Sequence, residues 1–266
     1  MPSVEAGDIR IFYEIHGEGE PLLLISGLGT DLSAWIFQVR DFSAEYRTIV
    51  FDNRDAGRTD ISPGPYTVRT LARDVAALMD ALGIERAHVL GLSMGGYIAQ
   101  ELALERPERI GSLILANTAA RLDSRGQLIV DTWSRMVSAG IDRELFVRAR
   151  LPWIFTGGVL NEPGKVDAVL RATLSNPYVQ SPEGYRRQVE AVRGFDVIGR
   201  LGEISAPALV VAGWEDLLVP VRFSQELAAG IPGAELVVLE GGHALFAEFH
   251  EAFDRAVLEF LRGDAR

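Results

Sequence analysis

Hydrophobic residues along this chain follow two spacings, which predict two kinds of element. Short apolar runs bounded by turn residues predict buried strands near residues 3–5, 8–16, 22–26, 47–52, 86–91, 111–117, 206–212 and 235–239. Apolar positions three and four apart predict helices near residues 32–42, 67–82, 94–106, 221–229 and 248–261. Because strands and helices alternate, we expect an α/β fold with a mostly parallel eight-stranded sheet and helices on both of its faces.

The alternation is interrupted between residues 119 and 203. This stretch predicts helices without a convincing strand, and it carries several aromatic residues: Trp133, Trp153, Phe155, Tyr178 and Tyr185. We interpret it as an inserted helical lid over residues 121–203, with residues 1–120 and 204–266 forming the core. The alternative, that this stretch simply continues a helical domain, stays open on the sequence.

Composition excludes several classes of protein. The 266 residues suit one α/β domain or two small ones, and the absence of cysteine excludes disulfides, thiolate catalysis and Cys-ligated metals. A formal net charge of −11 argues against nucleic-acid and anionic-membrane partners. No apolar run approaches the about 18 residues of a membrane span, and Met1–Asp8 lacks the regions of a signal peptide. We therefore expect a cytoplasmic protein.

One segment, Val89–Gly96, combines the end of a strand, a Gly-x-Ser-x-Gly turn and the start of a helix. In a nucleophile elbow the serine lies on a sharp, strained turn with its hydroxyl exposed at the top of the sheet. Glycine at positions 91 and 95 fits this geometry, because so sharp a reversal leaves no room for Cβ atoms. The segment predicts Ser93 as the nucleophile of a covalent mechanism. An ordinary strand–helix loop is the alternative.

A serine nucleophile needs a base, and the base needs an orienting acid. Of the four histidines, His243 follows the last predicted strand at its carboxyl end, the edge where sites assemble in open α/β sheets. The loop after the 206–212 strand contains two neighbouring carboxylates, Glu215 and Asp216, and spacing alone does not choose between them. Another possible acid position, after the strand that precedes the insertion, holds Asn117 and no carboxylate.

Acyl transfer also needs hydrogen-bond donors for the negative oxygen of the tetrahedral intermediate. The backbone amide of Met94, directly after the expected nucleophile, is one candidate. Glycines on both sides of Leu28 let the backbone approach a substrate, so we assign the Leu28 amide as the second donor. A plain glycine turn before a helix with Asp31 as its N-cap is the alternative, and both interpretations can hold at once. Candidate pocket residues are Gly27, Trp153, Phe155, Leu217 and Leu218.

These segments together resemble the α/β-hydrolase superfamily over essentially the whole chain. The matching pieces are residues 26–29 (Ser-Gly-Leu-Gly), 52–59 (Asp-Asn-Arg-Asp-Ala-Gly-Arg-Thr), 91–96 (Gly-Leu-Ser-Met-Gly-Gly), 213–220 and 242–244 (Gly-His-Ala). The resemblance implies the α/β-hydrolase fold with an inserted helical cap, and it assigns the acid to Asp216, three residues after Gly213. The order Ser93, Asp216, His243 is that of the superfamily's triad.

The closer resemblance is to enol-lactonase-like and methylesterase-like hydrolases. Residues 28–35 look like the oxyanion segment of 3-oxoadipate enol-lactonases, and residues 52–55 look more like aclacinomycin methylesterases. Ser26 and Leu92 depart from the pattern, since many members have histidine at the first position and histidine or glutamine at the second. These departures affect the expected pocket lining. Serine at position 93 disfavours the haloalkane dehalogenase and epoxide hydrolase branches, which attack with aspartate.

The resemblance implies a serine hydrolase that uses no cofactor or metal and cleaves a small-molecule carboxylic ester or lactone. Ser93 would form the acyl-enzyme, His243 would move the proton, and Asp216 would orient His243. Two kinds of enzyme with the same triad are alternatives: a cofactor-free perhydrolase or haloperoxidase, and a C–C bond hydrolase. A non-enzymatic small-ligand receptor is a less favoured alternative. The sequence carries no signal for the oligomeric state.

Overall fold

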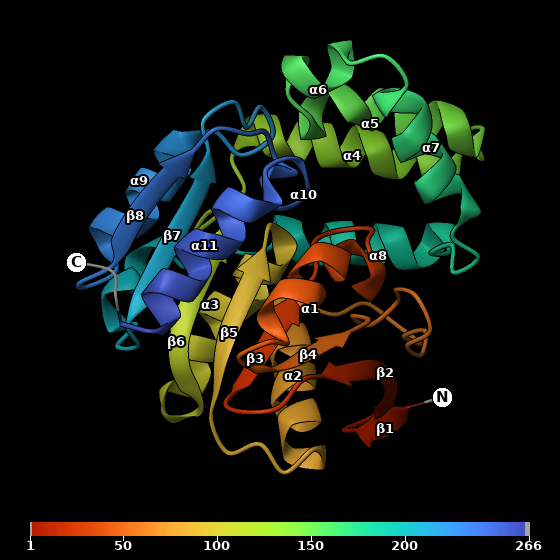
Figure 1. Ribbon diagram of the computed structural model, residues 1–266. Coiled ribbons are helices and arrows are strands. Elements are labelled where there is room, and N and C mark those ends of the chain that lie inside the picture. Colours follow the sequence, from red (N-terminus) through yellow and green to blue (C-terminus); the bar gives the residue numbers. More distant parts are fainter. Residues whose placement is uncertain (1, 264–266) are drawn as a thin grey trace.

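The computed structural model describes residues 2–263, and an eight-stranded sheet lies at its centre (Figure 1). The strands are β1 (Ser3–Ala6), β2 (Ile9–His16), β3 (Pro21–Ile25), β4 (Arg47–Phe51), β5 (Ala87–Leu92), β6 (Ile110–Ala116), β7 (Ala208–Gly213) and β8 (Glu235–Leu239). Their order across the sheet is β1-β2-β4-β3-β5-β6-β7-β8. The β1–β2 and β2–β4 pairs are antiparallel and the other pairs are parallel, which confirms the mostly parallel sheet.

Helices cover both faces of the sheet. One face packs against α2 (Val68–Ala81), α3 (Met94–Glu105) and α9 (Val221–Gly230), and the other against α1 (Ile36–Phe42) and α11 (His250–Leu261). Successive residues of β3 alternate between the two cores, with Leu23 and Ile25 in the first and Leu22 and Leu24 in the second. Burial on both faces explains why the central strands are apolar throughout.

The helix that the sequence predicts over residues 32–42 is broken, because a 3-10 turn (Leu32–Trp35) precedes α1. The helix predicted from residue 248 begins instead at His250 as α11, after a separate short helix, α10 (Leu245–Glu248). The breaks fall at Trp35 and Phe249, whose backbones leave helical geometry while their rings pack into the α1–α11 core. Aromatic packing thus overrides helix continuity. Among residues 2–263, no helix combines the length and apolar character needed to cross a bilayer.

The chain between β6 and β7 forms a further layer of helices: α4 (Ser124–Ser138), α5 (Arg143–Ile154), α6 (Gly157–Asn161), α7 (Lys165–Ser175) and α8 (Pro182–Arg193). We call α4 to α8 the inserted helices. Figure 1 shows α4 to α7 beyond the carboxyl ends of the strands, with α8 between them and the sheet. A short antiparallel bridge joins Arg121 to Asp196, so this stretch leaves and re-enters the core at one place.

Candidate active site

Ser93 occupies the sharp turn between β5 and α3. Its backbone φ is +54° and its ψ is −118°, a conformation that residues other than glycine rarely adopt. The turn is held on both sides, because the Ser93 amide donates to the carbonyl of Ala116 (3.0 Å) and Thr118 Oγ1 donates to the Ser93 carbonyl (2.7 Å). Backbone strain of this kind persists only where surrounding contacts enforce it, and it concentrates at active sites.

Two glycines make this turn possible. A Cβ atom at Gly95 would lie 2.0 Å from the carbonyl oxygen of Ile25, and one at Gly91 would lie 2.3 Å from the carbonyl oxygen of Gly95. Both distances are far below van der Waals contact, so neither position accommodates a side chain. The helix and the strands therefore approach each other closely enough to hold Ser93 at the carboxyl end of β5.

His243 and Asp216 face each other at the carboxyl ends of β8 and β7. His243 Nδ1 lies 2.8 Å from Asp216 Oδ2, and both side chains are buried. The other carboxylate oxygen accepts hydrogen bonds from the amides of Leu218 (2.8 Å) and Val219 (2.7 Å). Because the carboxylate accepts, Nδ1 of a neutral imidazole carries the proton and Nε2 presents its lone pair. Of the two carboxylates that spacing left open, Asp216 contacts the histidine and Glu215 is exposed.

Asn117 fastens the histidine loop to the aspartate loop, a role that the sequence did not reveal. It follows β6 with a positive φ of +44°. Its Nδ2 donates to the carbonyl oxygens of Gly242 (2.8 Å) and His243 (3.0 Å), and its Oδ1 accepts from the amide of Gly213 (3.0 Å). The available signal was an asparagine at a strand end, since asparagine adopts the left-handed region more readily than most residues.

Glu248 joins the histidine loop to the inserted helices. Its Oε2 accepts from the amide of Gly242 (2.6 Å), and its Oε1 accepts from the amide of Thr156 (2.6 Å), just after α5. The amide of Ala244 also donates to the carbonyl of Ile154 (2.9 Å). The loop that carries His243 and the end of α5 therefore form one hydrogen-bonded unit. No local pattern signals this contact, because 92 residues separate Glu248 from Thr156.

The glycine-rich loop after β3 lies beside Ser93. A Cβ atom at Gly27 would lie 3.3 Å from Ser93 Cβ and 3.8 Å from Ser93 Oγ. Within the described part of the chain, neither the Leu28 amide nor the Met94 amide donates a hydrogen bond to another residue. The loop and the start of α3 thus leave two backbone donors uncommitted on the two sides of the serine turn.

Buried polar side chains hold this loop in position. Asp52 Oδ1 accepts from the amide of Leu32 (2.8 Å). Burial raises the pKa of Asp52, against the lowering effect of its amide hydrogen bonds. From α8, Gln188 reaches two loops at once, since its Oε1 accepts from the amide of Gly29 (3.2 Å) and its Nε2 donates to the carbonyl of Arg54 (3.0 Å). The loop after β3 therefore depends on both the core and the inserted helices.

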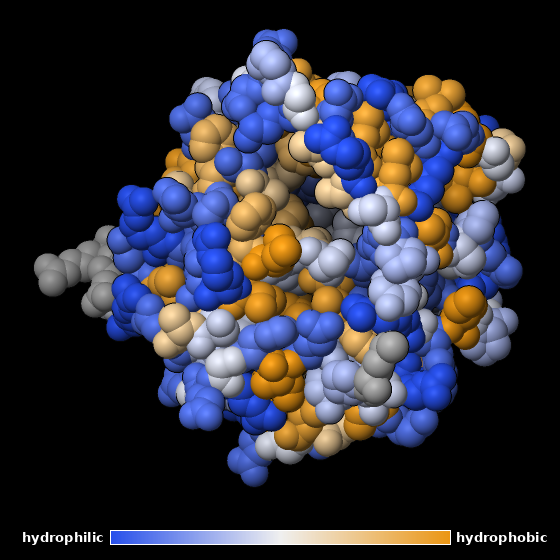
Figure 2. Space-filling view, turned by 45° about the vertical axis from the view of Figure 1, so that its right-hand side comes forward, coloured by the Kyte–Doolittle hydropathy of each residue, from blue (hydrophilic) through white to orange (hydrophobic). Residues whose placement is uncertain are grey.

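The candidate pocket residues lie in different environments. Trp153 and Leu218 pack with Leu28 against a group of buried side chains from α4 and α8, which we call the roof cluster: Ile129, Val130, Trp133, Tyr185 and Val189. Phe155 packs instead with apolar residues of α5 and α7, and Leu217 is exposed. Figure 2 shows a hollow in the surface of the molecule. It lies at the same height as the space between α4–α7 and α8 in Figure 1.

One group of side chains on the α1–α11 face has the composition of a metal site. Asp41 of α1, with His250 and Asp254 of α11, brings three ligand atoms within 4.8 Å of one another. Arg40 already donates to both carboxylate oxygens of Asp41 (2.6 and 2.8 Å), which offsets negative charge that a cation would need. Within residues 2–263, no group of this kind includes Ser93, Asp216 or His243.

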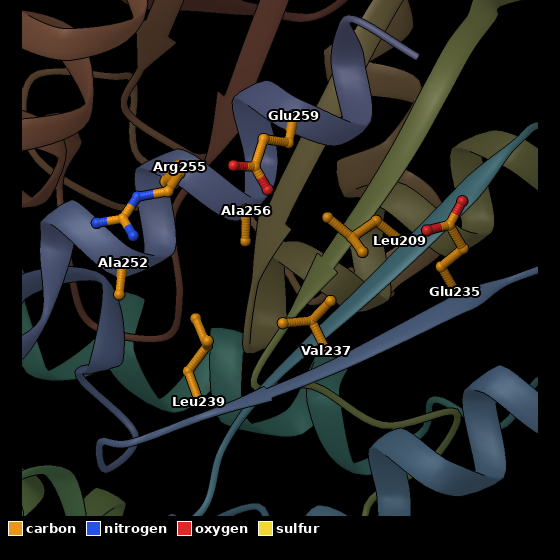
Figure 3. Close-up of a pocket in the computed structure, with 8 residues that line it drawn as sticks. All are labelled: Leu209, Glu235, Val237, Leu239, Ala252, Arg255, Ala256 and Glu259. Carbon is orange, nitrogen blue, oxygen red and sulfur yellow. The ribbon is translucent and has the colours of Figure 1, made fainter. Parts of the chain in front are cut away.

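A separate groove of about 260 Å³ lies between the β7–β8 edge of the sheet and α11 (Figure 3). Three apolar residues and one glutamate of the strands line it, together with two small and two charged residues of the helix: Leu209, Glu235, Val237, Leu239, Ala252, Arg255, Ala256 and Glu259. None of them lies in the loops that carry Ser93, Asp216 or His243. The groove is therefore not part of the site at the carboxyl ends of the strands.

Known proteins resemble this chain over most of its length. A family model described as the alpha/beta hydrolase fold matches residues 20–249. The chain belongs to the α/β-hydrolase family. A protein of Azorhizobium caulinodans named "Putative carbamate hydrolase RutD" is 34% identical over 98% of each chain. 3-Oxoadipate enol-lactonase 2 of Acinetobacter baylyi is 34% identical over 96% of this chain and 94% of its own.

Solved structures agree with the family. The crystal structure of the enol-lactonase from Burkholderia xenovorans is 33% identical and superposes with a TM-score of 0.91, over 98% of this chain and 100% of that one. These findings confirm the α/β-hydrolase fold and the resemblance to enol-lactonases. As a member of this family with relatives named as hydrolases, the protein is a hydrolase.

Proposed function

We propose that this α/β hydrolase is a serine esterase or lactonase that forms an acyl-enzyme on Ser93. The observation that carries the proposal is the buried His243–Asp216 hydrogen bond of 2.8 Å at the sheet edge where Ser93 is held at positive φ. A serine hydroxyl is a weak nucleophile by itself, and an imidazole oriented by a carboxylate is the usual way to activate it. Two relatives that share about a third of its residues carry lactonase or hydrolase names.

In the proposed mechanism, Ser93 Oγ attacks the carbonyl carbon while His243 Nε2 accepts the hydroxyl proton. The negative charge that develops on the carbonyl oxygen is stabilised by the amides of Leu28 and Met94. When the tetrahedral intermediate collapses, the bond to the alcohol oxygen breaks and His243 returns the proton to that oxygen. Water then attacks the acyl-enzyme with the same proton transfers, and the carboxylic acid leaves.

We assign the inserted helices the role of a lid over this site. Leu28, one of the proposed oxyanion residues, packs against the roof cluster of α4 and α8, so the same helices border the place where the carbonyl would bind. Excluding water from such a site strengthens the electrostatic interactions within it. The lid also supplies the surfaces that would distinguish one substrate from another.

The proposal is tested by hydrolysis of p-nitrophenyl butyrate and of a neutral lactone. Ser93→Ala should lower kcat/KM by about a thousandfold or more, while Ser138→Ala, at an exposed position of α4, should leave it unchanged. A fluorophosphonate probe should add its mass to the Ser93 peptide of the wild type and to no peptide of Ser93→Ala. Full turnover by Ser93→Ala would refute the assignment of the nucleophile. Acetate-dependent bromination of monochlorodimedone with peroxide and bromide, in place of hydrolysis, would favour the perhydrolase alternative.

A further inference from the structure

Arg150 lies on the face of α5 that points toward the roof cluster. Phe146, Arg150 and Trp153 are spaced four and three apart, and both aromatic residues of this set pack against the roof cluster. The Arg150 guanidinium carbon lies 5.1 Å from the ring centre of Trp133 and 5.4 Å from that of Phe146. These ring contacts attract the positive charge, but they leave its N–H groups without acceptors.

The guanidinium of Arg150 has no anionic partner within residues 2–263. Its Nε is enclosed and makes no hydrogen bond, and Arg150 forms no ion pair with a described acidic residue. Two acidic residues of α5 and α4 are paired with other arginines, Glu144 with Arg148 (2.8 Å) and Asp131 with Arg193 (3.4 Å). An enclosed N–H without an acceptor is costly, and its cost is recovered when an acceptor binds.

Further unpartnered polar atoms lie on the same side of the site. The hydroxyl of Tyr185 and both amide atoms of Gln180 are buried without a hydrogen bond to any residue that the structure describes, and Tyr185 is almost fully buried. Burial raises the pKa of Tyr185, and the positive charge of Arg150 opposes that rise, which indicates that the two groups lie near each other. Tyr185 and Phe146 also pack edge to face at 5.8 Å.

These groups adjoin the loop that would bind the reacting carbonyl. A Cβ atom at Gly29 would lie 2.7 Å from Tyr185 Cε2 and 3.7 Å from Gln180 Oε1. Gly29 is the neighbour of Leu28, whose amide we assign to the oxyanion. Tyr185 and Gln180 therefore border this loop, and Arg150 of α5 lies near Tyr185.

We propose that Arg150, with the Tyr185 hydroxyl and the Gln180 amide, binds a carboxylate of the substrate, so that this enzyme prefers esters or lactones that carry a second, anionic group. The inference rests on the proposed function, because it assigns the substrate class of that same site. A guanidinium with free N–H groups matches a carboxylate in charge and geometry and holds it through two parallel hydrogen bonds. The rings of Trp133 and Phe146 beside the guanidinium lower the local polarity and so strengthen this pair.

The test uses pairs of esters that differ only in the anionic group. On the acyl side, mono-p-nitrophenyl glutarate is compared with p-nitrophenyl pentanoate; on the alcohol side, 4-carboxyphenyl acetate is compared with 4-carbamoylphenyl acetate. Wild type should favour the anionic member of at least one pair. Arg150→Met should lower kcat/KM for that ester by about 10- to 100-fold, mainly through KM, and change the neutral ester by less than about threefold.

Two control variants separate charge from structure. Arg148→Met removes an exposed arginine of the same helix and should change neither ester by more than about twofold. Arg150→Lys keeps the charge without the planar fork, so it should retain part of the preference. Equal effects of Arg150→Met on anionic and neutral esters, or a wild type without preference in both pairs, would overturn the anionic subsite while leaving Ser93-dependent hydrolysis intact.

A binding measurement keeps the subsite testable if no ester is hydrolysed. Glutarate at millimolar concentration should raise the Tm of wild type and of Ser93→Ala, and should leave the Tm of Arg150→Met unchanged. Absence of turnover together with this pattern would refute the proposed function and support the subsite. Absence of any Tm shift in the wild type would refute the subsite as well.

Discussion

The side chain of Asn117 holds the backbone of His243 in place, although the two residues are 126 positions apart in the chain. Its amide nitrogen donates to the carbonyls of Gly242 and His243, and its amide oxygen accepts from Gly213 at the end of β7. One buried side chain thus sets the spacing between the loop that carries the histidine and the loop that carries Asp216. Correct spacing matters because a misplacement of about 1 Å can cost a hundredfold in rate.

Asn117→Asp tests this relationship, since aspartate has the same shape and also tolerates the left-handed region. The variant keeps the acceptor for Gly213 but loses two donors and sets a carboxylate against two carbonyl oxygens. We expect the free energy of unfolding to fall by roughly 2–4 kcal/mol and kcat on an ester to fall by about tenfold or more. Urea unfolding and steady-state kinetics measure the two effects. Wild-type values for both would mean that the hydrogen bonds to the histidine loop do not position it.

Arg187 and Asp55 form a buried ion pair that fixes α8 to the core. Both oxygens of Asp55 accept from the guanidinium (2.8 and 2.9 Å), and neither side chain is more than 3% exposed. Arg187→Met should destabilise the protein by about 3–5 kcal/mol, because it leaves a buried carboxylate without its partner. Arg186→Met removes an exposed neighbour that pairs with the exposed Glu190, and should cost at most about 0.5 kcal/mol. Similar midpoints of urea unfolding for the two variants would contradict this assignment.

Gly57 leaves room for the carboxylate of Asp52, which supports the loop after β3. Its φ is +55°, and a Cβ atom there would lie 2.2 Å from Asp52 Oδ2. Gly57→Ala should therefore destabilise the protein by roughly 2 kcal/mol or more, from left-handed strain together with displacement of Asp52. Gly64→Ala, where the added Cβ meets open space, should change stability by no more than about 0.5 kcal/mol. Thermal unfolding of the two variants distinguishes strain at Gly57 from a general effect of alanine.

Asp254 should make stability depend on pH. Burial, together with the neighbouring Asp41, raises the pKa of Asp254 to about 7 from a usual value of 3.8. The folded protein therefore holds a proton that the unfolded chain releases, so stability should fall as pH rises from about 4 to 7 and then level off. Asp254→Asn keeps an acceptor for Gln38 and removes the titration.

The difference between this variant and the wild type should therefore grow across that pH range in favour of the variant. Urea unfolding at pH 5, 6 and 8 measures it, and Glu251→Gln on the same helix serves as the matched control, expected to follow the wild-type profile. A constant difference between Asp254→Asn and wild type at all three pH values would show that Asp254 does not titrate in this range.

Much of the fold follows from local patterns in the sequence. The strand over 235–239 is found at the same residues, and the other strands differ by a few residues at their ends. Strand order alone brings His243 to the same edge as the loop of Glu215 and Asp216, since both loops follow parallel strands that end there. Choosing Asp216 over Glu215 needed the family pattern, because neighbouring loop residues have no periodicity that shows which is buried.

Other contacts could not be predicted because they join distant backbone atoms. Asn117 binds carbonyl groups about 125 residues away, and Asp55 meets Arg187 across 132 residues. Such contacts leave no trace in spacing or hydropathy, since any polar residue at these positions reads as an ordinary loop residue. The breaks at Trp35 and Phe249 were also missed, because the packing of a single ring decides them.

The carboxylate of Glu248 has a consequence for engineering this protein. Its Oε2 accepts a hydrogen bond from the Gly242 amide in the histidine loop, and its Oε1 accepts one from the amide of Thr156. A chimera that replaces the helices between β6 and β7 with those of another hydrolase would have to present a backbone amide at that same point. A graft without it would leave one Glu248 oxygen unpaired and would loosen the loop of His243, even if every residue of the core were unchanged.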